Sequence, residues 1–267
     1  MNDLKTLPSK ITLIPLVQLH PHRETVPHRE TVRDRLPAPP QVPVPAGVTM
    51  QNVKIDASDN WLNALLIDPN GNQAVVVNAA NTGLGGGGGI DGALGNWVEA
   101  KGKTRVWKDN NEVKSPVDGA RMTSVEVGKF AMCPVSFGDI YLAVGPQPSE
   151  VTTLANMSNM LENLFYDMLA KAHTEGKKQI VLCAISTSIF AGPGTEKTTG
   201  QSFTKEQFIK AAFNGAHRGI NRFKTDFAES SLQIILNGID GDGTRLPSNQ
   251  GLGSTNPYVL VYQYAQY

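Results

Sequence analysis

Short runs of apolar residues alternate along the chain with longer stretches in which apolar residues recur at helical spacing. The short runs are rich in valine, isoleucine and leucine, which is typical of strands buried in a sheet. One further run, 122–127, alternates between apolar and polar residues over most of its length, as a half-buried strand does. The predicted strands are 53–56, 73–78, 122–127 (the alternating run), 140–144, 180–185, 232–236 and 259–264.

Three stretches have the pattern of helices. Apolar residues recur every three or four positions over 149–174, which predicts one long amphipathic helix. Thr204 is a suitable N-cap for a second helix, whose apolar positions continue to Phe223. Residues 89–101 predict a third helix that starts in a glycine run. Strands separated by helices indicate an α/β sandwich with an at least partly parallel sheet.

Residues 1–48 differ from the rest of the chain. They contain nine of the 17 prolines, and the hexapeptide Pro-His-Arg-Glu-Thr-Val occurs there twice in tandem. We therefore expect residues 1–48 to form a flexible Pro-rich segment, and 49–267 to form the folded domain with a C-terminal extension. The duplication explains the recurrence of His20, His22 and His28. No cysteine or carboxylate cluster accompanies them, so we expect no metal site.

Composition and charge narrow the functional classes. Lys plus Arg equals Asp plus Glu at 24 each, which gives no support for nucleic-acid binding. Cys133 and Cys183 lie in apolar surroundings and are expected to be buried, reduced thiols. No run of about 18 apolar residues is available to span a membrane. Pro15 interrupts the apolar stretch near the N-terminus, so we expect a cytoplasmic protein, or one secreted without a recognisable signal peptide.

The most informative stretch runs from Val75 to Gly92. A short apolar strand ends in Asn78-Ala79-Ala80-Asn81, five consecutive glycines occupy 85–89, and Asp91 follows in the first turn of a predicted helix. Glycines let backbone N–H groups approach a ligand closely, and a helix N-terminus favours negative charge. The stretch therefore predicts a site for a phosphate or diphosphate, with Asn81 and Asp91 at the two ends of its loop.

A second loop of small residues, 186–193, follows the predicted strand 180–185. Ligands bind beyond the carboxyl ends of parallel strands, so we expect both loops at one edge of the sheet. The chain lacks G-x-x-x-x-G-K-[ST] and G-x-S-x-G, which argues against a P-loop nucleotide hydrolase and a serine hydrolase. A formal G-x-G-x-x-G at Gly87, Gly89 and Gly92 begins too far after the strand for a dinucleotide fingerprint.

These motifs resemble those of the macrodomain family. Asn78-Ala79-Ala80-Asn81, the glycine run and Ile90-Asp91-Gly92 are similar to its ADP-ribose-binding loop, with the family's spacing between asparagine and aspartate. Residues 141–146 resemble the strand that follows, and 184–190 resemble the second phosphate loop. The resemblance covers about 53–237 and implies a three-layer α/β/α sandwich with a mixed sheet, which holds ADP-ribose in a cleft.

The resemblance also implies roles for individual residues. Asn81 would orient the distal ribose, and Asp91 would position or activate a water that attacks the anomeric carbon. Backbone N–H groups of the two loops would bind the diphosphate, and Phe190 would pack near the distal ribose. The implied catalytic residues are Asn81 and Asp91; the implied ligand-binding residues are Asp68, Asn78, Gly86, Gly87, Gly88, Gly89, Ile90, Ser186, Thr187, Ser188, Ile189, Phe190 and Asn237.

The chain departs from the family pattern at several positions. Ser188 and Ala191 stand where the family's second loop commonly has glycine, and Leu94 stands near the position at which many hydrolases have histidine. The family's adenine-binding aspartate has no residue cleanly in register. Asp68 is nearest and could equally be an exposed turn residue, with Asp59 and Asn63 as rivals; Asn237, Asp240 and Asp242 could border the adenine end.

The leading interpretation is a monomeric ADP-ribosyl hydrolase that removes ADP-ribose from modified proteins and requires no cofactor or metal. Its partners would be ADP-ribose or an ADP-ribosylated protein, with no membrane or nucleic acid. A reader that binds ADP-ribose without turnover is the alternative, since binding-only macrodomains share most of these residues. A phosphatase or deacetylase of ADP-ribose esters is a third possibility.

Overall fold

The computed structural model describes residues 46–51, 73–135, 138–187 and 190–237. The chain divides into two units, 1–38 and 39–267, and every described residue belongs to the second. The predicted Pro-rich segment and the predicted strands 53–56 and 259–264 therefore fall outside the described residues, apart from the last positions of the segment.

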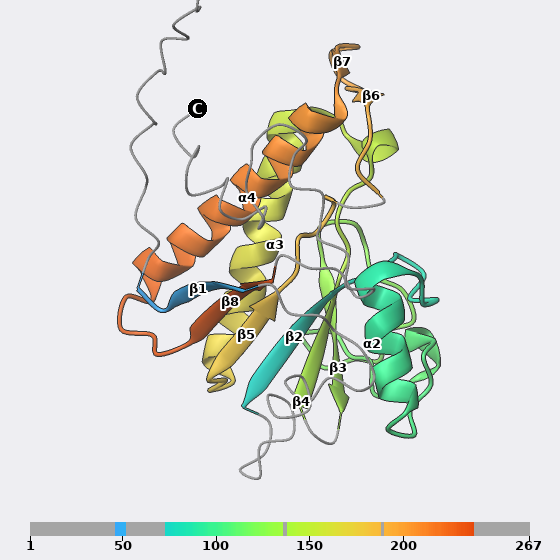
Figure 1. Ribbon diagram of the computed structural model, residues 1–267, viewed down its shortest axis with the longest axis vertical. Coiled ribbons are helices and arrows are strands. Elements are labelled where there is room, and N and C mark those ends of the chain that lie inside the picture. Colours follow the sequence, from blue (N-terminus) through green and yellow to red (C-terminus); the bar gives the residue numbers. More distant parts are fainter. Residues whose placement is uncertain (1–45, 52–72, 136–137, 188–189, 238–267) are drawn as a thin grey trace, which may run out of the picture. The chain divides into compact units, whose positions relative to one another are not determined.

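A six-stranded mixed sheet lies at the centre of the described part of the chain (Figure 1). Its strand order is β1-β8-β5-β2-β4-β3, and each neighbouring pair is parallel except β3 with β4. Helices cover the sheet, so its central strands are continuous apolar runs rather than alternating ones. The strands are β1 (Val48–Gln51), β2 (Ala74–Ala79), β3 (Phe130–Val135), β4 (Gly138–Ala143), β5 (Gln179–Leu182) and β8 (Gln233–Asn237).

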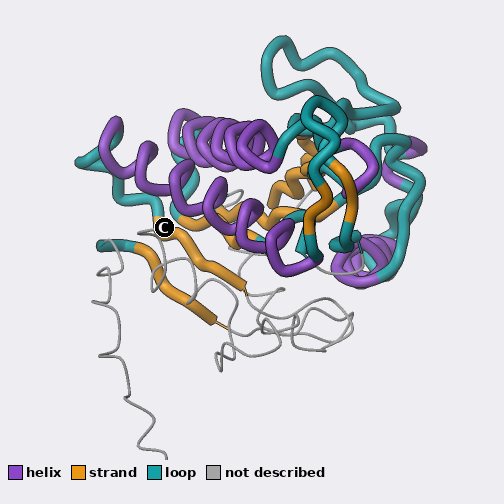
Figure 2. Tube along the Cα trace, turned by 90° about the horizontal axis from the view of Figure 1, so that it is seen from above, coloured by secondary structure: helices purple, strands orange, loops and turns teal. Residues whose placement is uncertain are grey.

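Helices flank the sheet in the expected α/β/α arrangement. Helices α3 (Leu154–Thr174) and α4 (Lys205–Asp226) run side by side over one face, and α2 (Gly89–Glu99) packs beside β2 on the other (Figures 1 and 2). The predicted N-cap of α4 is confirmed: Thr204 Oγ1 accepts from the Gln207 N–H, and the Gln207 side chain accepts from the Thr204 N–H.

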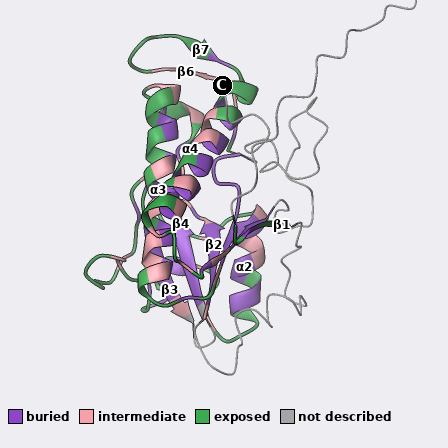
Figure 3. Ribbon diagram, turned by 90° about the vertical axis from the view of Figure 1, so that its left-hand side faces the viewer, coloured by how far each residue is buried: buried purple, intermediate pink, exposed green. Residues whose placement is uncertain are grey.

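Buried side chains are concentrated on the central strands and on the helix faces that meet them (Figure 3). The apolar face predicted for α4 is buried from Phe208 to Phe223. Gly215 and Gly219 allow α4 to approach α3 closely, because a methyl group at either position would clash with the α3 backbone at Ser158 or Glu162. Helix packing thus fixes α3 and α4 as one layer.

Short elements complete the fold. The extra sequence between β5 and α4 forms the two-stranded sheet of β6 (Gly194–Thr195) and β7 (Ser202–Phe203). Glu196 links it to the start of α3, where its Oε1 accepts from the Leu154 N–H at 2.7 Å. Two 3₁₀ helices, η1 (Trp107–Asp109) and η2 (Pro148–Glu150), precede β3 and α3. Among the described helices, none combines the length and hydrophobicity needed to cross a membrane.

One strand prediction is wrong. Residues 122–127 form no strand, and the strand of this region is β3, which pairs with β4. The Val125 N–H donates to the Thr82 carbonyl at 2.8 Å, and the Met122 N–H donates to the Val113 carbonyl at 2.9 Å. These backbone hydrogen bonds anchor the stretch to neighbouring loops rather than to the sheet. The other predicted strands and helices that fall on described residues are confirmed with shifted ends; α3, for instance, begins at Leu154 after its N-cap Thr153. The strands β1, β3, β6 and β7 were not predicted.

Candidate functional site

The two predicted loops leave neighbouring strands at the same edge of the sheet. Strands β2 and β5 are parallel, with Val76 opposite Val181. Their carboxyl ends therefore lie side by side, and the loop after β2 (81–88) meets the loop after β5 (183–193). This is the edge at which ligands bind in open α/β sheets.

The loop after β2 adopts a conformation that its glycines permit. Gly86 and Gly89 have positive φ angles of 76° and 60°, a region that side chains disfavour. Helix α2 begins at Gly89, and its N-cap Gly88 provides no side-chain hydrogen bond. Because Gly88 has no side chain, no side-chain acceptor caps the first N–H groups of α2. The helix dipole places positive potential at these N–H groups.

A buried polar cluster lies behind this loop. Asp91 is 4% exposed and Asn78 is fully buried. Asp91 Oδ1 accepts from Asn78 Nδ2 at 2.5 Å and from the indole Nε1 of Trp107 at 2.6 Å. Asn78 and Asp91 thus form a buried pair, a contact that the sequence did not predict. Trp107 was missed in the sequence, because it lies in the short 3₁₀ helix η1, which has no periodic signal.

The second carboxylate oxygen of Asp91 has a different environment. Oδ2 has no hydrogen-bond partner among the described residues and lies against the loop, where a Cβ at Gly87 would be 3.0 Å away. Burial raises the pKa of Asp91, while the hydrogen bonds from Asn78 and Trp107 and the charge of Arg105 act in the opposite direction. Oδ2 is itself buried, and Asp91 does not line the cavity that is described below.

Asn81 organises the start of the loop. Its Oδ1 accepts from the Gly85 N–H at 3.1 Å, and its Nδ2 donates to the Gly86 carbonyl at 3.3 Å. Leu84, between them, is fully buried and has a positive φ of 50°. The amide of Asn81 is half-buried, so it can exchange the long Gly86 contact for a ligand hydroxyl.

The second loop is shaped by backbone conformation. Ser186 has a φ of 62°, which is uncommon for a residue with a side chain, and its buried Oγ has no hydrogen-bond partner among the described residues. Thr187 Oγ1 donates to the Ala184 carbonyl at 2.8 Å and closes the turn. Gly145, after β4, leaves room for this turn, because a Cβ there would clash with Ile185 and Ser186.

The two loops line one cavity of about 70 Å³. Asn81 contributes from the first loop, and Ser186 and Phe190 contribute from the second. Phe190 is 43% exposed, so much of its ring is available to a ligand. The remaining lining residues are Ala79, Ala80, Thr82, Val127, Val144, Gly145, Gln147, Glu150 and Ile185.

Other predicted site residues lie apart from this cavity or outside the described residues. Asn237 is buried at the carboxyl end of β8, which is separated from β2 by β5. The predictions for Asp68, Ser188 and Ile189, and for Asp59, Asn63, Asp240 and Asp242, fall on residues that the structure does not describe.

Thiol and metal chemistry receive no support from the described residues. Cys133 and Cys183 are free and buried, as predicted, and burial raises the pKa of each to about 12, which keeps both thiols protonated. Within the described ranges, no three His, Cys, Asp or Glu side chains gather where they could hold a metal ion.

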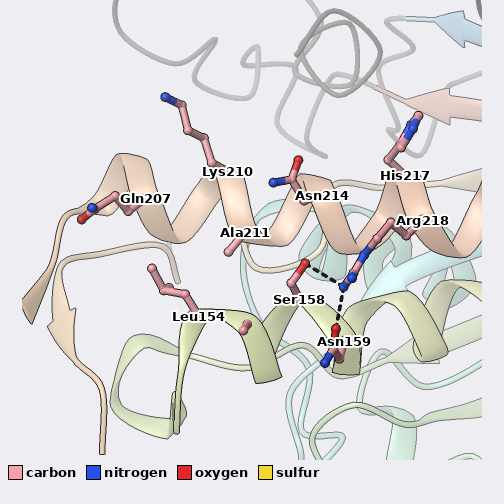
Figure 4. A pocket seen from close by; sticks show the side chains of 10 residues that line it. Leu154, Ser158, Asn159, Gln207, Lys210, Ala211, Asn214, His217 and Arg218 are labelled. Atoms are coloured by element: carbon pink, nitrogen blue, oxygen red, sulfur yellow. Dashed lines mark hydrogen bonds between the residues drawn. The ribbon is translucent and has the colours of Figure 1, made fainter. Parts of the chain in front are cut away.

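A larger and more open cavity, of about 430 Å³, lies between α3 and α4 (Figure 4). Arg218 crosses it and donates to Ser158 Oγ at 3.2 Å and to Asn159 Oδ1 at 2.7 Å. Its cations are already paired, Arg218 with Glu162 and Lys210 with Glu206. None of the predicted site residues lines this cavity.

The family model for the Macro domain matches residues 77–199. No curated protein matches the chain. An *Oceanobacillus iheyensis* macrodomain with ADP is 21% identical, with 71% of this chain and 83% of that chain covered and a TM-score of 0.46.

Two further solved structures are similar. A *Trypanosoma brucei* macrodomain in complex with ADP-ribose is 16% identical, with 72% of this chain and 62% of that chain covered and a TM-score of 0.43. An alphavirus P23pro-zbd structure is 16% identical; 75% of this chain aligns with only 23% of that longer chain, with a TM-score of 0.47. The family match spans β2, the glycine-rich loop, α2, β4, α3 and β5, all in the order described above. Residues 77–199 of this chain are therefore similar to the Macro domain family.

Proposed function

We propose that this domain binds ADP-ribose at the edge of the sheet where the loops after β2 and β5 meet. The observation that carries the proposal is the cavity lined jointly by Asn81 and by Ser186 and Phe190, about a hundred residues later in the sequence. A ligand that bridges both loops needs polar groups along its length, which ADP-ribose has.

The glycine-rich loop suits the diphosphate. Gly87 and Gly88 are exposed and carry no side chain, so a phosphate oxygen can approach the start of α2. Backbone N–H groups at a helix N-terminus form hydrogen bonds to anions, and the helix dipole adds to the attraction. No cationic side chain is required for this contact.

The cavity suits the distal ribose rather than the whole ligand. About 70 Å³ is well below the roughly 300–1,000 Å³ of a complete small-molecule pocket. The Asn81 amide and the Ser186 hydroxyl supply donors and acceptors for sugar hydroxyls, and the Phe190 ring supplies an apolar surface. The proposed ligand thus places its terminal ribose between the loops and its diphosphate along the glycines.

Hydrolysis of an ADP-ribosyl ester is a second candidate function, and Asp91 Oδ2 is the observation that favours it. The water oxygen would form a bond to the anomeric carbon of the distal ribose while the bond from that carbon to the carboxylate oxygen of the modified side chain breaks. That carboxylate oxygen would keep the electron pair. Asp91 Oδ2 would take the proton of the attacking water and stabilise the oxocarbenium-like transition state. The products are ADP-ribose and an unmodified carboxylate side chain.

Calorimetry with ADP-ribose, together with a release assay on protein ADP-ribosylated on acidic residues, tests both proposals. The Asp91→Asn variant keeps the side-chain shape and an oxygen acceptor for Asn78 and Trp107, but it is no base. We expect both proteins to bind ADP-ribose and only the parent to release it. Binding without release by the parent would leave a reader domain. Absence of binding by the parent would contradict the proposed function.

A further inference from the structure

The segment Thr104–Asn110, which contains η1, contacts the glycine-rich loop and α2 at several points. The Lys108 N–H donates to the Leu84 carbonyl at 3.0 Å. The Arg105 carbonyl lies so close to Gly86 that a Cβ there would be 3.1 Å from it, and Trp107 Nε1 donates to Asp91. These contacts reach the loop at Leu84 and Gly86, and they reach the first turn of α2 at Asp91.

The segment is itself fixed by hydrogen bonds. Asn110 is 5% exposed; its Nδ2 donates to the Thr104 carbonyl at 2.7 Å, and its Oδ1 accepts from the Thr104 N–H at 3.2 Å. The Val106 N–H donates to Thr104 Oγ1 at 3.2 Å. The segment is therefore held in shape by its own hydrogen bonds, in addition to its contacts with the loop. Trp107 is fully buried.

We propose that Trp107 is a positioning residue of the ADP-ribose site, which acts by holding the Asp91 carboxylate and, through it, the start of α2 and the glycine-rich loop. The inference rests on the proposed function. Its geometric basis is the sharing of Asp91 Oδ1: Asn78 approaches from β2 and Trp107 from η1. With both donors present, the carboxylate cannot rotate without losing a buried hydrogen bond, so Oδ2 stays against Gly87.

The groups that face Asp91 predict how its titration responds. Asn78 and Trp107 donate to it, and Arg105 is the charged group whose field reaches it. Removal of the indole N–H would remove a donor to the carboxylate, so the pKa of Asp91 would rise further. A role of Trp107 in packing alone would not move this pKa in a variant that preserves the shape of the ring.

The Trp107→Phe variant tests the proposal with two measurements. We expect ADP-ribose affinity to fall by about tenfold or more, as loss of a hydrogen bond to a charged group does. We expect the ¹³C NMR titration of the Asp91 carboxyl in the ligand-free protein to move to higher pH. Trp97→Phe is the matched control, since it also replaces a fully buried tryptophan, and we expect affinity within about threefold of the parent.

A second replacement separates the hydrogen bond from packing. Benzothienylalanine at position 107 keeps the bicyclic ring and substitutes sulfur for the N–H, so it preserves the fold if Trp107→Phe does not. A shifted Asp91 titration together with weakened binding in this protein would support the proposal. Two results would overturn the positioning role: unchanged ADP-ribose binding, or weakened binding with an unshifted Asp91 titration. Neither result would contradict the proposal that the domain binds ADP-ribose. If the parent binds no ADP-ribose, the proposed function fails and the positioning role fails with it, whatever the titration shows.

Discussion

The two loops that meet at the cavity are held in place by different means. The loop after β2 is fixed by side-chain hydrogen bonds from a distant segment, through Asn78, Asp91 and Trp107. The loop after β5 is fixed by local backbone conformation at Ser186 and by the close approach of Gly145. The first loop should therefore be sensitive to loss of polar atoms, and the second to changes in volume and backbone freedom.

The largest effect is expected from Asp91→Ala. This change leaves the buried donors of Asn78 and Trp107 without their acceptor, and each unsatisfied buried group costs about 1–3 kcal/mol. We expect the free energy of unfolding to fall by roughly 2–4 kcal/mol, measured by denaturant titration. Asp91→Asn keeps an acceptor oxygen and should lose less than half as much. Equal losses in the two variants would show that the hydrogen bonds do not hold the loop.

Gly145→Ala should have the next largest effect. Its methyl group would clash with Ile185 and Ser186, and overpacking of this kind costs about 1–3 kcal/mol. We expect lower stability together with weaker ADP-ribose binding, because the second loop must move. Gly192→Ala, in the second loop itself, is the control: its Cβ would lie 3.5 Å from Pro148, an ordinary contact. Equal losses of stability and of ADP-ribose affinity in the two variants would contradict the steric explanation.

Ser186→Gly should produce a smaller effect of opposite sign on stability. Glycine tolerates the φ of 62° that strains a serine, so we expect a gain of up to about 1 kcal/mol in the free energy of unfolding. Loss of the Ser186 hydroxyl from the cavity should weaken ADP-ribose binding at the same time. Thermal unfolding and calorimetry on one preparation measure both. A destabilised variant would contradict the view that backbone strain is stored at this position.

The smallest expected effect is a pH dependence of the free energy of unfolding that arises from Asp91, behind the first loop. Burial raises the pKa of Asp91 above 3.8, the ordinary value for an aspartate, so its contribution to stability is complete below that pH and declines as pH rises through the folded-state pKa. The difference in unfolding free energy between the parent and Asp91→Asn should therefore decrease with rising pH and then level off. If the difference in unfolding free energy instead increases with pH, the hydrogen bonds and the charge of Arg105 outweigh burial in setting the pKa of Asp91.

The sequence was sufficient to predict the loops but not how they are held. Apolar runs predicted β2 and β5, and the glycines with Asn81 and Asp91 indicated a candidate site, because strand composition and turn chemistry are local properties. The hydrogen bond from Trp107 to Asp91 joins residues sixteen positions apart, and Trp107 lies in the short 3₁₀ helix η1. No periodicity marks such a contact.

The errors have a similar physical origin. Residues 122–127 alternate like a strand, yet their backbone hydrogen bonds go to Thr82 and Val113 in neighbouring loops. Strand β3 was missed, although its neighbour β4 was found; β3 contains Pro134 and lies at the sheet edge, where proline is tolerated. In both segments, tertiary contacts rather than the local sequence pattern determine whether a strand forms.

Amide NMR with ADP-ribose tests the central claim, that the two loops bind one ligand between them. Titration of ¹⁵N-labelled protein should shift the amide signals of residues 85–91 and of Ser186, Thr187 and Phe190 with a single dissociation constant. The signals of 207–218, which border the larger cavity between α3 and α4, should remain in place. Shifts confined to 207–218, or to only one of the two loops, would contradict the account.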